Sequence, residues 1–482
     1  MKILNKENIK KIIKDTVEIV SGQEIKILNE KKLKKSLIDE LVFQATFNQD
    51  KEVVDFCRDL IKKIAKKQGI FLGSIYDFYK KKAKDNRKVT IPAINIRGMA
   101  YNTGRAIFES AIKNNVKVFI LEIARSEIGY TDQRPAEYTN SILAAAIKEG
   151  YRGVLFLQGD HFQIKADKYK ENPPEEREKI KELIREAMEA GFYQIDLDMS
   201  TLVDWSVKDH DLQQKTNYKE TALLTAYIRD LEKELGLEKI GIVINLGGEI
   251  GEIGKGIQGR NSTVEDLEAF MKGYTKELSL LEKEKGYSLN GITKIAVQSG
   301  TKHGGIRDEK GKVMKEIKVS FNTLAELGKI SREKYGLAGV VQHGASTLDP
   351  DCFVLFAGKP APRGFKISQD LLNEESLKLL SENPVAEVHL ATAYQDTILN
   401  HPVFPKKLAG EIKKWVLENY PPKEGEDEEK SYISNRKNAW GHFKLNLWTL
   451  SPKLQDKIRK TLVKQFSKDV FENLGVKNFN LF

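Results

Sequence analysis

The chain has 482 residues, of which 40% are apolar and 31% charged, and its net charge of +10 is spread along the sequence, which does not indicate a nucleic-acid-binding protein. It has only two cysteines, Cys57 and Cys352, no run near the roughly 18 apolar residues of a membrane span, and no apolar signal-peptide core at its start. We therefore expect a soluble cytoplasmic protein, without disulfides or a cysteine-based zinc site, that binds neither nucleic acid nor membranes.

Residues 1–88 predict a helical extension. Lys and Glu are dense there, apolar residues recur at spacings of three and four, and Gly and Pro are scarce. The segment ends in the charge run 80–88, which could be a basic patch. A solvated helix end that leads into a linker is the favoured interpretation of such a run.

From residue 89 to 405 the pattern changes to short apolar runs that alternate with long amphipathic helical segments. The eight runs are Val89–Ile96, Val116–Glu122, Gly153–Leu157, Tyr193–Asp198, Ile240–Asn245, Lys294–Gln298, Gly339–Gln342 and Val385–Leu390. Parallel neighbouring strands need helical crossovers, so eight such units predict an α/β fold, a (β/α)8 TIM barrel. An open doubly wound sheet is the alternative, but the Gly-rich phosphate turn after the first strand is absent.

Residues 406–482 predict a C-terminal helical segment, interrupted by the polar loop 420–430. Its last part, 453–474, is amphipathic. We expect this face to pack on the barrel or on a partner subunit, and we expect a homo-oligomer.

Histidines follow three of the predicted strands. In a barrel, functional groups project from the carboxyl ends of the strands. His161, His303 and His343, three of only seven histidines, occupy such positions, and Glu249 follows the fifth strand. Three imidazoles, with or without a carboxylate, suit Zn²⁺ and leave one position for substrate. For any one of these histidines alone, hydrogen bonding or helix capping is the alternative.

Asp160 directly precedes the first of these histidines. A carboxylate in a partly desolvated site can exchange a proton with a substrate hydroxyl. The alternative is that it only orients an imidazole. Nearby glycines predict a phosphate cradle in the loop of Gly344 and Ser346, although such glycines can also merely turn the chain. The glycine-dense stretch 245–256 predicts a mobile loop over the pocket.

Together these motifs resemble those of the class II (metal-dependent) fructose-bisphosphate and tagatose-bisphosphate aldolases, over about residues 91–395. The matching segments are Pro92–Ile96, Gly159–His161, Gly248–Gly254, Gly300–Gly304, His343–Ser346 and Val388–Thr392. Their number and order make the resemblance more specific than any single motif. It implies an active barrel enzyme of carbohydrate metabolism, such as glycolysis.

The resemblance also implies a role for each matching residue. His161, His303, His343 and Glu249 would bind Zn²⁺, with a monovalent cation as a second candidate cofactor, and Asp160 would exchange the proton of the substrate hydroxyl. The residues implied for the substrate and its phosphate are Asn95, Gly304, Gly344, Ser346 and Thr392. The reaction would be reversible cleavage of a phosphorylated sugar, a ketose (bis)phosphate such as fructose 1,6-bisphosphate, to dihydroxyacetone phosphate and an aldehyde.

The last predicted strand departs from the family pattern. His389 and Ala391 stand where the family has Asn and Asp, and the family's proton-abstracting Glu has no counterpart near Ile257. Glu252 is the closest acid, so Glu252 and His389 are the candidates for that proton transfer. The changed strand also leaves open a metal-dependent sugar epimerase or an aldolase of another sugar.

Two further segments resemble the non-catalytic subunit of tagatose-bisphosphate aldolase, which leaves open the role of a partner subunit. These segments are Ile195–Ser200 and Ser434–Arg436. That relative lacks the later zinc histidines, whereas His303 and His343 are present in this chain. The sequence therefore favours an active enzyme.

Overall fold

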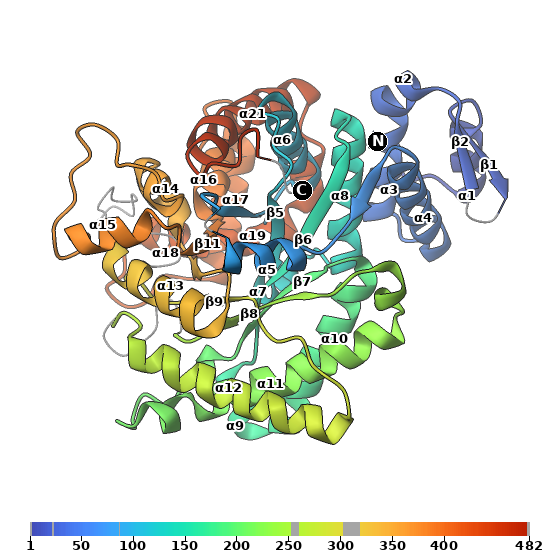
Figure 1. Ribbon diagram of the computed structural model, residues 1–482. Coiled ribbons are helices and arrows are strands. Elements are labelled where there is room, and N and C mark those ends of the chain that lie inside the picture. Colours follow the sequence, from blue (N-terminus) through green and yellow to red (C-terminus); the bar gives the residue numbers. More distant parts are fainter. Residues whose placement is uncertain (1, 22–23, 86, 252–259, 302–318, 480–482) are drawn as a thin grey trace.

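The computed structural model describes residues 2–21, 24–85, 87–251, 260–301 and 319–479. Within this part of the chain, eight parallel strands pair in chain order and the last pairs with the first, so they close into a barrel (Figure 1). The strands are β4 (Ile91–Asn95), β5 (Ile120–Ala124), β6 (Gly153–Gln163), β7 (Gln194–Asp198), β8 (Asn245–Glu249), β9 (Lys294–Ala296), β10 (Val340–Gln342) and β11 (Val385–Leu390). The predicted (β/α)8 barrel is confirmed.

Helices cover the outside of the barrel, and the sequence specifies their ends. In α10 (Pro173–Ala190), the Asn172 side chain accepts a hydrogen bond from the backbone of Glu175, which caps the start of the helix. Gly191, at φ 97°, adopts the left-handed conformation that ends it. The other helices between strands are α6 (Ala100–Lys113), α7 (Arg125–Tyr130), α8 (Pro135–Glu149), α9 (Ala166–Glu171), α11 (His210–Glu234), α12 (Val264–Lys285), α13 (Phe321–Tyr335), α14 (Asp351–Phe356) and α15 (Glu374–Leu380).

The fifth strand of the barrel lies later in the chain than the sequence pattern indicates. We predicted a strand at 240–245 and a loop from 245 onward, but β8 is formed by Asn245–Glu249 and is buried throughout. Close packing favours glycine at position 247 of β8, because a Cβ there would lie 2.3 Å from Asp196 Oδ1. The loop prediction was therefore wrong for 245–249, and residues 252–256 lie outside the described residues.

The N-terminal extension is mainly helical, as expected, but it also contains strands. Its elements are α1 (Lys6–Ile13), β1 (Val17–Ser21), β2 (Glu24–Ile27), α2 (Glu30–Lys32), η1 (Leu33–Leu37), α3 (Ile38–Phe47), α4 (Lys51–Lys67), β3 (Ile70–Leu72) and α5 (Tyr76–Lys84). Strands β1 and β2 form an antiparallel hairpin. Strand β3 pairs in parallel with the first residues of β6, outside the closed barrel.

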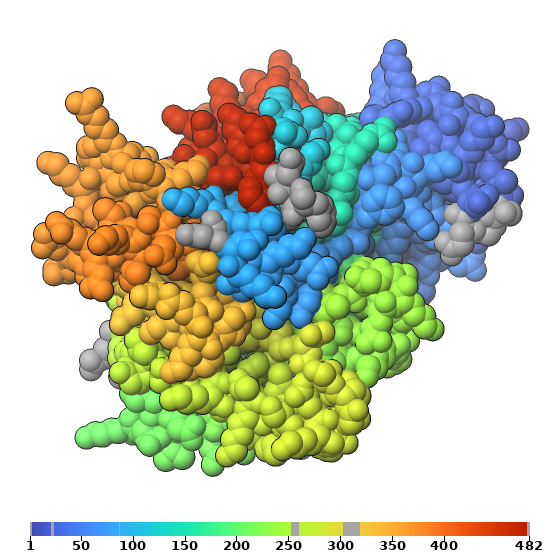
Figure 2. Space-filling model, in the orientation of Figure 1, coloured from blue at the N-terminus to red at the C-terminus, as the bar shows by residue number. Residues whose placement is uncertain are grey.

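Helix α5 lies across the amino-terminal ends of the barrel strands. The backbone N–H of Ile75 donates to Gln194 Oε1 over 3.0 Å, at the start of β7. The hydroxyl of Tyr76 donates to Asn290 Oδ1 over 3.0 Å, shortly before β9, and Lys82 donates to Asn383, shortly before β11. On this face of the molecule the segment around α5 lies at the centre (Figure 2), so it covers the floor of the barrel.

The C-terminal segment packs on the barrel, as one of the two alternatives predicted. Helix α21 (Pro452–Gln465) lies against α6, and Ser467, in the π-helix that follows α21, is hydrogen-bonded to Ser110 over 2.8 Å. No helix in the described part of the chain is long and apolar enough to span a membrane. The remaining elements are η2 (Ser200–Leu202), η3 (Leu237–Ile240), η5 (Ala345–Thr347), α16 (Thr392–Leu399), α17 (Lys406–Asn419), α18 (Glu428–Asn435), η6 (Arg436–Asn438), α19 (Ala439–His442), α20 (Lys444–Trp448), α21 (Pro452–Gln465) and η7 (Phe466–Glu472).

Candidate metal centre

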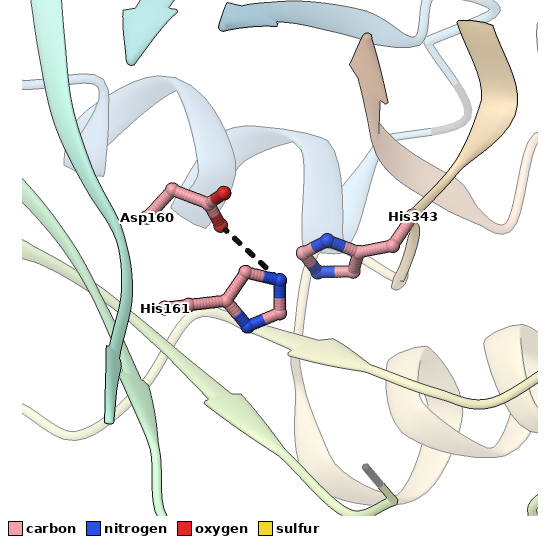
Figure 3. A group of neighbouring side chains, drawn as sticks. All are labelled: Asp160, His161 and His343. Carbon is pink, nitrogen blue, oxygen red and sulfur yellow. Dashed lines mark ion pairs between the residues drawn. The ribbon is translucent and has the colours of Figure 1, made fainter. Parts of the chain in front are cut away.

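A distortion of β6 brings Asp160 and His161 into the same site. Successive residues of a regular strand point to opposite faces. Here the pairing of β6 with β7 shifts register between Gly159 and Phe162, and His161 adopts the left-handed conformation at φ 43°. Asp160 Oδ1 consequently lies 3.8 Å from His161 Nε2 (Figure 3).

Carboxylates from the next two strands surround the ring of His161. Its Nδ1 lies 2.9 Å from Asp198 Oδ2 and 3.2 Å from Glu249 Oε2. The other oxygen of Asp198 accepts hydrogen bonds from the backbone and hydroxyl of Ser200, which fixes this carboxylate. The ring of His343, which follows β10, lies 4.5 Å from that of His161 and faces it from across the barrel (Figure 3).

These residues fit a divalent cation. One ligand atom each from Asp160, His161 and His343 lie within 4.8 Å of one another, and the same holds for His161, Asp198 and Glu249. Glu249 is 3% exposed, and its Oε1 accepts no hydrogen bond from the described residues. Buried imidazole nitrogens next to an unsatisfied carboxylate oxygen suit Zn²⁺. His303, the third predicted histidine ligand, lies outside the described residues.

The electrostatics of this site are those of a cation site. Burial and the neighbouring Asp198 raise the pKa of Glu249 to about 8. Burial opposes the charged form of His161, but Asp160 and Glu249 nevertheless raise its pKa well above the ordinary value. With only protein groups around it, the imidazole of His161 is therefore protonated. Metal binding would release such protons, because the ligands must be deprotonated.

A second cluster, centred on His389, lies in the barrel interior beside the first. The rings of His389 and His343 are 4.1 Å apart. His389 Nε2 lies 2.7 Å from Glu387 Oε1, and its Nδ1 lies 3.2 Å from Glu122 Oε1 and 3.3 Å from Asp160 Oδ1. Burial disfavours an imidazolium, but Glu122 and Asp160 raise the pKa of His389 well above its ordinary value.

Three charged residues around His389, namely Glu122, Lys294 and Glu387, were not predicted from the sequence. Lys294 Nζ lies 2.6 Å from Glu387 Oε1 and 2.9 Å from Asp196 Oδ2, and its side chain is fully buried. Gln158 Nε2 donates to both Glu387 and Glu122. Glu387 stands inside the apolar run Val385–Leu390, whereas Lys294 is the first residue of β9, so the sequence marks the first position but does not name its partners.

The same cluster bears on the proton-transfer predictions. Burial raises the pKa of Asp160, but His161 and His389 together hold it well below the ordinary value, so Asp160 is a carboxylate. It is therefore unprotonated, as a group that accepts a proton must be. His389, the second candidate, lies close enough to Asp160 to exchange that proton. Glu252, the other candidate, lies outside the described residues.

The predicted phosphate-contacting residues come together at the last two strands of the barrel. Gly344, at φ 69°, precedes η5, which contains Ser346. The backbone N–H of Ala393 donates to Ser346 Oγ over 3.4 Å, so the loop after β10 meets the start of α16, where Thr392 lies. Many TIM barrels bind phosphate between the loops after these two strands. Gly304 lies outside the described residues.

Asn95 lies on the same rim, at the carboxyl end of β4. Its Nδ2 donates to Glu127 Oε2 over 2.6 Å, and its Oδ1 accepts from Arg97 Nε over 3.2 Å. Arg97 also forms an ion pair with Glu127. The amide of Asn95 is thus held at the edge of the site by two charged neighbours.

The fold and the site define a TIM-barrel protein with a candidate metal centre at the carboxyl ends of its strands. The model of one protein family, fructose-bisphosphate aldolase class-II, matches residues 78–437, so the chain belongs to this family. Membership indicates a lyase-type enzyme of a family that generally uses a divalent metal. No curated protein matches the chain.

Among solved structures, the chain is similar to a probable tagatose 6 phosphate kinase from Sinorhizobium meliloti 1021. The two are 13% identical, with a TM-score of 0.53, over 80% of this chain and 100% of the other. A fructuronate-tagaturonate epimerase from Cohnella laeviribosi is 12% identical, with a TM-score of 0.47, over 97% of this chain and 87% of the other. At this identity, the first of these likenesses supports the fold alone.

Proposed function

We propose that the protein is a zinc-dependent class II aldolase that reversibly cleaves a ketose phosphate to dihydroxyacetone phosphate and an aldehyde. The observation that carries the proposal is that His161 belongs to two groups of candidate ligands on one rim of the barrel, one with Asp160 and His343 and one with Asp198 and Glu249. Ser346 follows His343 in the same loop. A ketose phosphate whose oxygens bind a metal also needs a second position nearby for its phosphate. The loops after β10 and β11 provide that second position.

The chain's own residues would bind and orient the substrate as follows. Backbone N–H groups and the hydroxyls of Ser346 and Thr392 would bind the phosphate, at the starts of η5 and α16. His161, His343 and Glu249 would hold the zinc, with Asp198 fixing the ring of His161. Zinc, when bound, supplies a Lewis acid that polarises the carbonyl group of the ketose.

Asp160 and His389 would carry the two protons of the cleavage reaction. Asp160 is a carboxylate and would accept the proton of the substrate's C4 hydroxyl as the C3–C4 bond breaks. His389, as an imidazolium, would donate a proton to C3, which the broken bond leaves as a carbanion. The proton on Asp160 would then return to His389 across the 3.3 Å contact between them. The cycle closes without a proton from outside, and synthesis runs it in reverse.

The test is an assay for triose-phosphate release from a panel of ketose mono- and bisphosphates. It compares protein as purified, protein stripped by a chelator, and stripped protein restored with zinc. We expect release only with zinc, and loss of turnover in Asp160→Asn with the zinc content unchanged. Release by metal-free protein would overturn the proposal. A chain that binds no zinc and cleaves none of the sugars would instead support a non-catalytic partner subunit.

An epimerase is the second candidate, and the last strand favours it. His389 and Ala391 replace the Asn and Asp that the aldolases place there. In an epimerase, the C3–C4 bond that Asp160 helps to break would re-form on the opposite face of the aldehyde carbonyl. Product analysis by NMR separates the candidates, because an epimerase converts the ketose without releasing triose phosphate.

A further inference from the structure

Helix α5 of the N-terminal extension reaches the candidate site through one buried carboxylate. The hydroxyl of Tyr79 donates to Glu387 Oε2, and Glu387 Oε1 contacts His389 Nε2 at 2.7 Å. Tyr79 and Glu387 are fully buried, and His389 is 4% exposed. The three side chains thus connect the floor of the barrel to the residue that we place at its reacting end.

The two oxygens of Glu387 have different surroundings. Oε1 is approached by His389, by Lys294 at 2.6 Å and by Gln158 at 2.7 Å. Tyr79 donates to the other oxygen, Oε2. Rotation about the Cγ–Cδ bond moves both oxygens together, so the bond from Tyr79 to Oε2 adds to the contacts that hold Oε1 in place. Tyr79 therefore helps to set the position of Oε1 relative to the His389 ring.

The position of the Tyr79 hydroxyl is itself fixed, because α5 is held at both ends. Ile75, just before the helix, is bonded to Gln194, and Lys82, near its end, is bonded to the side chain and backbone of Asn383. These partners belong to the bases of β7 and β11. A rotation or shift of α5 would break these bonds. The Tyr79 hydroxyl is therefore held in a fixed position next to Glu387.

We propose that Tyr79 is a positioning residue that acts through Glu387 to orient the imidazole of His389. The N-terminal extension, which lies outside the closed barrel, then takes part in turnover. The inference that Tyr79 orients His389 depends only on the hydrogen bonds of Tyr79, Glu387 and His389. The expected effect on turnover rests, in addition, on the proposed function.

The test is Tyr79→Phe, which removes the hydroxyl and keeps the ring. Two matched controls lose a tyrosine hydroxyl elsewhere: Tyr76→Phe on the same helix, and Tyr274→Phe, whose buried hydroxyl bonds Thr225. Steady-state kinetics of the zinc enzyme should give a kcat about tenfold lower for Tyr79→Phe with KM unchanged, as expected when an interaction of the transition state alone is weakened. The controls should keep the kcat of the parent protein.

An NMR measurement on labelled histidines gives a readout that does not depend on activity. The Nε2–H signal of His389, assigned by its loss in His389→Gln, should shift in Tyr79→Phe and stay in place in both controls. An unchanged signal together with an unchanged kcat would overturn the proposal and leave Tyr79 with a structural role. A shifted signal in a protein that cleaves no ketose phosphate would refute the proposed function and support the positioning role.

A second variant covers the case in which Tyr79→Phe does not fold. Replacing Tyr79 by 3-fluorotyrosine keeps the hydroxyl and makes it a stronger donor to Glu387. The His389 signal should then shift, while the zinc content and the thermal midpoint stay the same. No shift in the fluorinated protein would overturn the proposal.

Discussion

Lys294 is a fully buried cation, and its removal tests the charge balance of the barrel interior. Its ammonium group lies 2.6 Å from Glu387 Oε1 and 2.9 Å from Asp196 Oδ2. The substitution Lys294→Met keeps much of the volume of the side chain and removes its charge. The buried Glu387 and the half-buried Asp196 then lose the cation that lies between them.

The expected cost follows from the pKa of Glu387. Burial raises this pKa, but Lys294 and His389 lower it from 4.5 to about 2. Each unit by which a pKa is lowered corresponds to about 1.4 kcal/mol. At pH values above the ordinary pKa of a Glu, these partners therefore stabilise the folded protein by about 3 kcal/mol. Loss of one partner of a buried ion pair costs about 3–5 kcal/mol. We therefore expect Lys294→Met to lower the free energy of unfolding by about 3 kcal/mol.

Urea unfolding at about pH 8 and about pH 6 measures this cost and its pH dependence. Without Lys294, the pKa of Glu387 in the folded state rises above its value in the unfolded chain, so protonation stabilises the folded variant. The difference from the parent protein should therefore shrink as the pH falls. The double variant Lys294→Met/Glu387→Gln should recover part of the loss. A loss below about 1 kcal/mol, or an equal loss at both pH values, would refute the reasoning.

Three further changes probe the rim and the packing of the barrel. Asp198→Asn removes the carboxylate that fixes His161 and should weaken zinc binding by about 10- to 100-fold, measured by competition with a chelator. Ser346→Ala should raise KM about tenfold and leave kcat unchanged, because phosphate binding contributes equally to ground and transition states. Steady-state kinetics measure both constants, and a fall in kcat would contradict this expectation. Gly247→Ala would place a Cβ 2.3 Å from Asp196 Oδ1 and should lower stability by about 1–3 kcal/mol in urea unfolding, and an unchanged midpoint would contradict this packing.

The barrel could be predicted from the sequence wherever its strands are apolar. The last strand, Val385–Leu390, has the bounds that its apolar run indicated. The fifth strand was misplaced, because apolar patterns do not register a glycine that is needed for space. Gly247 lies in a strand since Asp196 and Lys294 from the adjacent strands fill the volume beside it. That packing depends on residues about 50 positions away in either direction.

The candidate site was predictable in its outer part and hidden in its inner part. The rule that functional groups follow barrel strands selects Asp160, His161 and His343, and the structure brings them together. The rule says nothing of Glu387, which lies inside β11, or of Lys294, which begins β9. A buried charge inside an apolar strand is stable only if a group from a distant part of the chain pairs with it. The local sequence pattern does not show which residue that group belongs to.

The position of α5 has a consequence for how the chain folds. The N-terminal extension leaves the ribosome before the barrel strands, yet the partner of Ile75 lies 119 residues later in the chain and that of Tyr79 lies 308 residues later. Contacts of such long sequence separation form slowly, because a large loop must close first. Docking of α5 is therefore a late step of folding. A nascent chain that lacks β11 can form most of the barrel strands, but it lacks Glu387, the partner of Tyr79. Helix α5 then cannot dock fully over the amino-terminal ends of the strands.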